Sequence, residues 1–192
     1  MDDERAAGEL TEHLALRDAD GATMTPREDL IRAMARYRTA RREFLVALGI
    51  PASNRDPLAE FSERLVAELV GGRLADSRVA KGFDVVDPDG RKIQVRYLAN
   101  PEGAWVNEHL ITFDDDLDFY ALAIIEALEP TAVICFARDT LAQVCAQLGK
   151  RHPQQERTLQ LTRVNAKACL SDRARFAPLG VRVWRAPEWS EA

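Results

Sequence analysis

Two stretches in the first third of the chain carry apolar residues at helical spacing. The first begins at Thr25-Pro26, where a Thr N-cap and a Pro at the first helical position precede acids in the first turn, and it ends near Gly49. The second runs from Pro57 to the glycine pair at 71 and 72, which is typical of a helix C-terminus. The pattern therefore predicts two helices. Their apolar stripes are Leu30, Met34, Tyr37, Phe44, Leu45 and Leu48 (broken by Arg41) in the first, and Leu58, Phe61, Leu65, Val66 and Leu69 in the second.

From residue 82 onward the pattern is mainly that of strands. Residues 82–86 and 92–98 flank a Pro-Asp-Gly turn and predict a hairpin. Residues 119–128 suit a helix or a buried strand; we interpret them as a strand because Glu129-Pro130-Thr131 has turn composition and the next segment is clearly β. The remaining expected elements are the strand 131–137, a helix 140–148 capped by Asp139, the strand 158–162, a helix 165–175 and the strand 181–185.

This order of elements predicts a mixed α/β domain built around one sheet. Residues 1–22 are acidic, with little apolar periodicity, and are expected to be a disordered tail. Residues 23–52 are expected to form an N-terminal helical appendage, and residues 53–192 the α/β domain.

Composition limits the classes of protein to which this chain can belong. The 192 residues are 46% hydrophobic, which is enough for a packed core. No apolar run reaches the length of about 18 residues that a membrane-spanning helix needs, and the acidic N-terminus lacks the order of a secretion signal. Cys135, Cys145 and Cys169 have no CxxC spacing and are expected to be buried thiols in a reducing compartment. We therefore expect a cytoplasmic protein with no membrane partner.

Charge is segregated along the chain. The net charge of −5 argues against a uniformly basic coat for nucleic acid. Residues 101–130 nevertheless carry acids and no Lys or Arg, whereas residues 150–185 are strongly basic and arginines cluster between 32 and 42. This segregation is compatible with a local surface facing phosphates, and equally with solvated faces that balance one another.

The expected hairpin carries the candidate chemistry. Asp84 lies on its first strand, and Gln94 and Arg96 lie two residues apart on its second strand, so that the two share one face. Paired strands lie about 4.8 Å apart, and Glu60 comes from the preceding helix. Phosphodiester hydrolysis commonly uses a divalent cation, and Mg²⁺ takes one or two carboxylates together with waters and phosphate oxygens. The pattern favours a metal site.

These residues resemble a known family. Glu60 on a helix, Asp84 after Lys81-Gly82, and Gln94-Val95-Arg96 together resemble the PD-(D/E)XK restriction-endonuclease-like superfamily, in particular its small bacterial members with a QxK-type motif. The resemblance implies a central mixed β-sheet flanked by helices, with Mg²⁺ as cofactor and DNA as partner. It also implies that Glu60, Asp84 and Gln94 hold the metal, and that Arg96 stands where the family has a Lys that positions water and stabilises charge.

The sequence departs from the family pattern at three positions. Phe83 replaces a Pro, and Gln94 replaces a carboxylate with a neutral amide. Arg96 replaces the Lys, and a guanidinium is never deprotonated in proteins, so it stabilises charge but cannot act as a base. Lys81 is a candidate substitute for that Lys. Candidate contacts to nucleic acid are Lys81, Arg32 and Arg36.

Three hypotheses stay open at this point. The first is a Mg²⁺-dependent DNA endonuclease of restriction or defence, weakened or inactivated by Arg96. The second is an inactive protein of the same fold that binds DNA or a protein partner. The third is an interaction protein, self-associating as a homodimer, in which Glu60 pairs with Arg64 and Asp84 with Arg96 as purely structural ion pairs.

Overall fold

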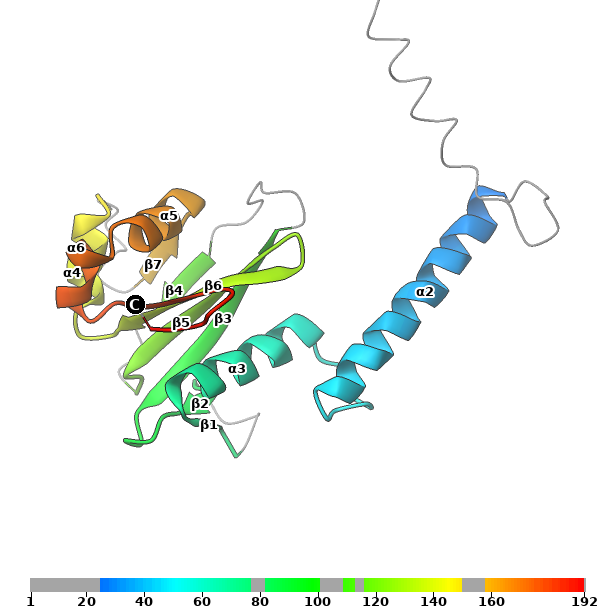
Figure 1. Ribbon diagram of the computed structural model, residues 1–192, viewed down its shortest axis with the longest axis horizontal. Coiled ribbons are helices and arrows are strands. Elements are labelled where there is room, and N and C mark those ends of the chain that lie inside the picture. Colours follow the sequence, from blue (N-terminus) through cyan, green and yellow to red (C-terminus); the bar gives the residue numbers. More distant parts are fainter. Residues whose placement is uncertain (1–24, 77–81, 101–108, 113–115, 150–157, 192) are drawn as a thin grey trace, which may run out of the picture. The chain divides into compact units, whose positions relative to one another are not determined.

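The computed structural model describes residues 25–76, 82–100, 109–112, 116–149 and 158–191 (Figure 1). The chain divides into two compact units, Met1–Asn54 and Arg55–Ala192, each described by itself below. Within the described residues no helix is long and apolar enough to cross a membrane.

The first unit contains the predicted N-terminal helix, α2 (Pro26–Ala47). Its start is a capping box: the Thr25 hydroxyl accepts from the Glu28 N–H at 3.3 Å, and the Thr25 N–H donates to the Glu28 carboxylate at 2.9 Å. Toward its C-terminus Leu45 is buried, whereas Met34 and Tyr37 are exposed. Only the last part of the predicted apolar stripe is therefore packed.

The second unit begins with α3 (Pro57–Val70), which confirms the second predicted helix. Asp56 caps its N-terminus by accepting from the Leu58 N–H at 3.0 Å. Gly71 ends it in the left-handed conformation, with φ +66°, which a glycine adopts at little cost.

The second unit is a mixed α/β domain around a six-stranded sheet, as the order of elements predicts. All neighbouring strands are antiparallel except β3 and β5, which are parallel. The strands, in spatial order, are β1 (Arg73–Leu74), β2 (Val85–Val86), β3 (Lys92–Asn100), β5 (Phe119–Glu126), β6 (Glu129–Ala137) and β8 (Arg182–Arg185).

A second, two-stranded sheet corrects the expectation of a single sheet. It pairs β4 (His109–Thr112) with β7 (Thr158–Leu161). Parallel strands need a long crossover connection, and β4 lies in the crossover from β3 to β5. A four-residue strand inside such a connection has too little periodicity to be recognised in the sequence, so β4 was missed and β7 was assigned to the wrong sheet.

Alternation of side chains along the central strands builds two cores, one on each face of the sheet. On one face Ile93 and Val95 pack with Val66 of α3. On the other face Tyr120 and Leu122 pack against α4 (Leu141–Gln147), α5 (Arg163–Ser171) and α6 (Arg173–Phe176), so the sheet lies between two helical layers (Figure 1). A short 3₁₀ helix, Ala177–Leu179, follows α6.

The segment expected to be a strand over 119–128 is a strand, as predicted, but it ends at Glu126. The turn comes earlier than the expected Glu129-Pro130-Thr131. Glu126 pairs with Glu129, so the turn consists of Ala127 and Leu128, with φ +50° and +66°. Positive φ at both central residues is the geometry that matches the twist of two paired strands. Pro130, expected in the turn, lies inside β6 next to a register shift at which β6 has one extra residue, Thr131, and a strand tolerates a proline at such a bulge.

Two helix boundaries also differ from expectation. The N-cap of α4 is Thr140 rather than Asp139, and its hydroxyl donates to the Leu179 carbonyl at 2.5 Å. The helix expected over 165–175 is broken at Asp172, whose backbone leaves the helical region (φ −123°, ψ 63°) and separates α5 from α6.

All three cysteines are buried free thiols, as expected from their spacing. Burial raises the pKa of Cys135 and of Cys169 to about 12. These thiols are therefore in the unreactive protonated form at neutral pH.

Asp87 organises the turn between β2 and β3. Its Oδ1 accepts from the N–H groups of Asp89 and Arg91 at 3.0 and 2.9 Å, and its Oδ2 accepts from Arg91 Nε at 2.7 Å. Burial by itself raises the pKa of this carboxyl, but the hydrogen bonds and the charge of Arg91 outweigh burial and hold the pKa below its ordinary value of 3.8.

We expect Asp87→Asn to lower the free energy of unfolding at pH 7 by about 2 kcal/mol, because hydrogen bonds to the charged form are lost. A folded-state pKa below the unfolded value means that the stabilisation is present above pH 3.8 and disappears as the pH falls through the folded-state pKa. Denaturant unfolding at several pH values should show the two proteins converging in acid. Asp89→Asn, at an exposed acid of the same turn, should change stability by less than about 1 kcal/mol, and a pH-independent deficit of Asp87→Asn would contradict the account.

The outer side of β8 is covered by the chain itself. Trp184 of β8 forms an isolated bridge with Glu191, and the Arg182 guanidinium donates to both Glu191 oxygens at 2.5 and 2.6 Å. The charge of Arg182 and these hydrogen bonds lower the pKa of Glu191.

Candidate functional site

Asp84 immediately precedes β2, so the strand expected over 82–86 is shorter than predicted, and backbone hydrogen bonds to both sides fix Asp84. Its N–H donates to the Ile93 carbonyl at 2.9 Å, and its carbonyl accepts from the Ala75 N–H at 2.9 Å. Its carboxylate Oδ2 accepts from the Val95 N–H at 2.7 Å. The side chain of Asp84 therefore has a defined direction, set by β3.

Gln94 and Arg96 flank Val95 on β3. Since Val95 faces α3 and Leu98 faces the opposite core, alternation directs Gln94 and Arg96 to the sheet face away from α3. Arg96 Nη1 lies 3.7 Å from Asp84 Oδ2 and donates to the Val95 carbonyl at 2.9 Å. The ion pair between Asp84 and Arg96 is thus present, but the Arg96 side chain is 49% exposed, so the pair is open to solvent.

The Glu60 carboxylate forms ion pairs with two arginines. Its side chain is fully buried, and its two oxygens each lie 2.9 Å from an arginine, Oε1 from Arg55 Nη1 and Oε2 from Arg64 Nη1. The predicted pairing of Glu60 with Arg64 is confirmed, and Arg55 is an additional partner that the spacing does not indicate. A carboxylate paired with two guanidinium groups is a structural ion-pair cluster rather than an available ligand.

Glu63 is the acid that α3 presents beside Asp84. A small cavity of about 10 Å³ is lined by both carboxylates, and its other lining residues are Arg55, Leu74, Ala75 and Phe83. This volume is close to the minimum that holds one water molecule. Glu63 is 6% exposed, and Arg55 Nη2 lies 3.4 Å from its Oε1. Arg55 thus bridges Glu60 and Glu63.

Sequence reasoning missed Glu63 because it assigned the wrong face of α3 to the core. The buried residues of the helix are Glu60, Ser62, Glu63, Val66 and Ala67, whereas most of the expected stripe is only half-buried. A signal was available: Glu63 precedes Val66 and Ala67 by three and four residues, so it lies on their face.

The remaining candidates are placed as follows. Lys81 lies outside the described residues. Arg32 and Arg36 are exposed on α2, in the first unit. Among the residues with described placement, no three His, Cys, Asp or Glu side chains are grouped so that they could hold a metal ion.

The donor chemistry around Asp84 is nonetheless that of a magnesium site. Mg²⁺ is usually bound through one or two carboxylates, with waters and substrate phosphates completing the shell. Asp84 and Glu63 supply two carboxylates beside one cavity, and the Gln94 amide is a neutral oxygen donor on the neighbouring strand. Positive charge lies next to both acids, from Arg55 beside Glu63 and from Arg96 beside Asp84.

Comparison of the sequence with protein-family models and with curated proteins gave no match.

Proposed function

We propose that the second unit is a PD-(D/E)XK nuclease-like domain, with a restriction-endonuclease-like core that acts on the phosphodiester backbone of DNA. The observation that carries the proposal is the position of Asp84. Its carboxylate is oriented by β3, shares a cavity with Glu63 of the preceding helix, and has Arg96 of β3 3.7 Å away. A cytoplasmic role in restriction or defence is the setting that the family resemblance suggests.

Each side chain has a distinct part in the proposed site. Asp84 would hold Mg²⁺ together with either Glu63, on the side of α3, or the Gln94 amide oxygen, on the opposite face of β3. When bound, the ion polarises a phosphoryl oxygen and lowers the pKa of a water. Arg96, half-exposed beside Asp84, is placed to contact a phosphate and to stabilise negative charge that develops on it. A guanidinium cannot accept a proton from water, so Arg96 supports charge but not base catalysis. Arg55 has to leave Glu63 for that carboxylate to bind a cation.

A second function is favoured by the two arginines. Asp84 and Glu63 each already lie within ion-pair distance of a guanidinium, Arg96 and Arg55 respectively. An acidic site whose charge is offset in this way suits a fold that binds a phosphate backbone without cleaving it. The proposal thus includes an inactive DNA-binding protein of the same architecture.

The test is a plasmid-cleavage assay with Mg²⁺ or Mn²⁺, comparing wild type, Asp84→Ala and Arg96→Lys. We expect Asp84→Ala to lose about 100-fold or more in rate, since it removes a metal ligand. Arg96→Lys should cleave faster than wild type, because a lysine restores a side chain that can lose its proton. The matched control is Asp76→Ala, which removes an acid whose side chain is 90% exposed and whose ion-pair partner is the surface residue Arg73.

The outcomes separate the two functions. Cleavage by wild type that Asp84→Ala abolishes supports an active nuclease. Cleavage by Arg96→Lys alone supports a disabled nuclease scaffold, and fluorescence anisotropy with labelled duplex DNA should then show that wild type still binds. Absence of cleavage by both wild type and Arg96→Lys, with no DNA binding, contradicts the proposal.

A further inference from the structure

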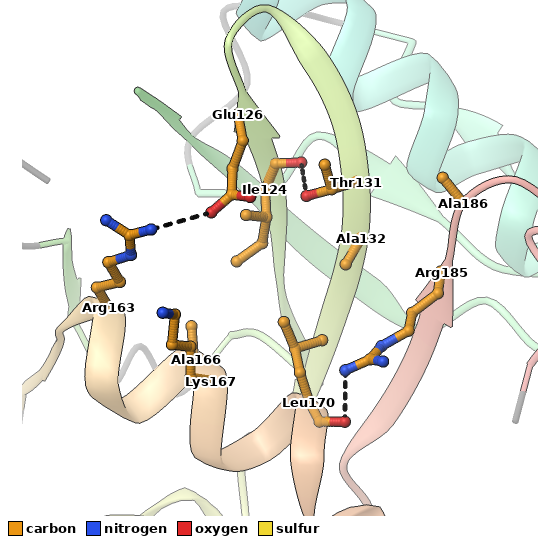
Figure 2. Close-up of a pocket in the computed structure, with 10 residues that line it drawn as sticks. All are labelled: Ile124, Glu126, Thr131, Ala132, Arg163, Ala166, Lys167, Leu170, Arg185 and Ala186. Carbon is orange, nitrogen blue, oxygen red and sulfur yellow. Dashed lines mark hydrogen bonds and ion pairs between the residues drawn. The ribbon is translucent and has the colours of Figure 1, made fainter. Parts of the chain in front are cut away.

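A larger cavity, of about 310 Å³, lies at the other side of the second unit. Its walls come from α5, from the ends of β5 and β6 next to their turn, and from the end of β8 (Figure 2). Figure 2 shows Arg163 and Arg185 on opposite sides of this cavity, with the α5 residues Ala166 and Leu170 between them. None of these residues belongs to the proposed nuclease site.

Among the described residues, three cations and one acid line the cavity. Arg163, Lys167 and Arg185 face a single carboxylate, that of Glu126. The ion pair between Arg163 Nη2 and Glu126 Oε1 is long, at 3.9 Å. The charge around the cavity is therefore mainly positive, and only part of it is offset by direct pairing.

Arg163 has a specific unsatisfied group. Its Nε is buried and has no hydrogen-bond partner among the described residues. A buried donor without a partner is unfavourable, so a ligand that accepts from the Arg163 guanidinium would offset part of that cost. On the opposite wall, Arg185 Nη2 donates to the Leu170 carbonyl at 2.7 Å, which holds the second guanidinium in place.

The rest of the lining is apolar or weakly polar. Ile124 and Ala132 come from the sheet, and Ala166 and Leu170 come from α5; Thr131 adds a hydroxyl that donates to the Ile124 carbonyl at 3.3 Å. The volume is at the lower end of the usual range of about 300–1,000 Å³ for ligand pockets. Cationic walls around an apolar floor of this size suit a small molecule with an apolar body and one strongly anionic group.

We propose that this cavity is a binding site for a phosphate-bearing ligand of mononucleotide size. The phosphate lies among Arg163, Lys167 and Arg185, because guanidinium groups bind phosphate oxygens through paired N–H donors, and the flat organic part rests on Ile124 and Leu170. A free nucleotide and the terminal nucleotide of a strand present the same chemistry. The proposal does not depend on nuclease activity at Asp84.

The test is isothermal titration calorimetry of the full chain with adenosine 5′-monophosphate at about 0.15 M salt, where screening limits nonspecific attraction to surface charge. Adenosine serves as the phosphate-free probe. We expect the monophosphate to bind at least about tenfold more tightly than adenosine, and Arg163→Gln and Lys167→Gln each to weaken it about tenfold, as for loss of one charge-assisted hydrogen bond. Arg73→Gln removes an equal charge from an exposed residue of the same unit and should leave binding unchanged.

Lys167 is exposed, so its exchange should not impair folding, and thermal unfolding of each variant checks this. Equal affinities for adenosine and its monophosphate, or wild-type affinity in a folded Lys167→Gln variant, would overturn the proposal. Asp84→Ala should bind the monophosphate as wild type does, so failure at one site is distinguishable from failure at the other. Competition by a short oligothymidylate with a 5′-phosphate, but not by the same oligonucleotide without it, would identify strand ends as the source; competition by neither would identify free nucleotides.

Discussion

Exchanging Glu63 for glutamine is expected to lower metal-dependent cleavage by about 100-fold or more while changing the stability of the fold little. Glu63 lines the cavity that it shares with Asp84, and Arg55 Nη2 lies 3.4 Å from its Oε1. A glutamine keeps the size of the side chain and one oxygen but removes the charge that attracts a divalent cation. The measurement is the plasmid-cleavage rate in whichever protein cleaves, wild type or Arg96→Lys.

Glu60→Gln is the matched control, since it lies one helical turn earlier on α3. For Glu60→Gln we expect an effect on stability instead of on cleavage. The free energy of unfolding should fall by about 2 kcal/mol, because Arg64 and Arg55 lose a fully buried counter-charge. The cleavage rate per folded molecule should be near that of the parent protein. If Glu60→Gln abolishes cleavage and Glu63→Gln does not, the ligand is Glu60, as the family resemblance first implied, and the ion-pair cluster has to open during the reaction.

Gly72→Ala is expected to destabilise the second unit by about 3 kcal/mol, the upper end of the range for overpacking. A Cβ at this position would lie 2.4 Å from the Val86 carbonyl oxygen and 3.1 Å from the Cα of Asp87. Both are backbone atoms of the hairpin, which cannot move aside as the tip of a side chain does. Denaturant unfolding followed by circular dichroism measures the effect.

The consequence of Gly72→Ala should extend to the proposed site. Displacing β1 from β2 weakens the bond from the Ala75 N–H to the Asp84 carbonyl, which helps to fix Asp84. Gly90→Ala is the control: nothing lies within 4 Å of the added Cβ, and only the positive φ of +83° opposes it, at about 1 kcal/mol. A Gly72→Ala variant no less stable than Gly90→Ala would contradict the packing argument.

The sequence was most informative where a local signal specifies the structure. The Thr25-Pro26 start of α2, the Gly71 end of α3 and the Pro-Asp-Gly turn after β2 each carry their own stereochemical reason, and all three are present. The face shared by Gln94 and Arg96 also follows directly from the strand period.

The sequence was least informative where the partner of a segment is distant in the chain. The strand β4 pairs with β7, about 50 residues later, and neither strand indicates the other. On α3, most apolar residues at helical spacing lie on a half-buried face, whereas the acids Glu60 and Glu63 lie on the buried face. Arginines at 55 and 64 provide the counter-charge that makes this burial possible. The apolar stripe alone does not reveal an acid accommodated in this way, and the spacing of Glu63 from Val66 and Ala67 becomes informative only once that face is known to be the buried one.

The segment that covers β8 affects how readily the protein aggregates with other copies of itself. A strand at the border of a sheet offers unsatisfied N–H and C=O groups to any passing chain and so seeds intermolecular aggregation. At β1 the exposed border is only two residues long. At β8 the bridge from Trp184 to Glu191, held by Arg182, occupies the border from within the same chain. Protonation of Glu191 in acid removes its negative charge from Arg182 and weakens the hold on that segment, so we expect aggregation at low pH to depend on this carboxyl group.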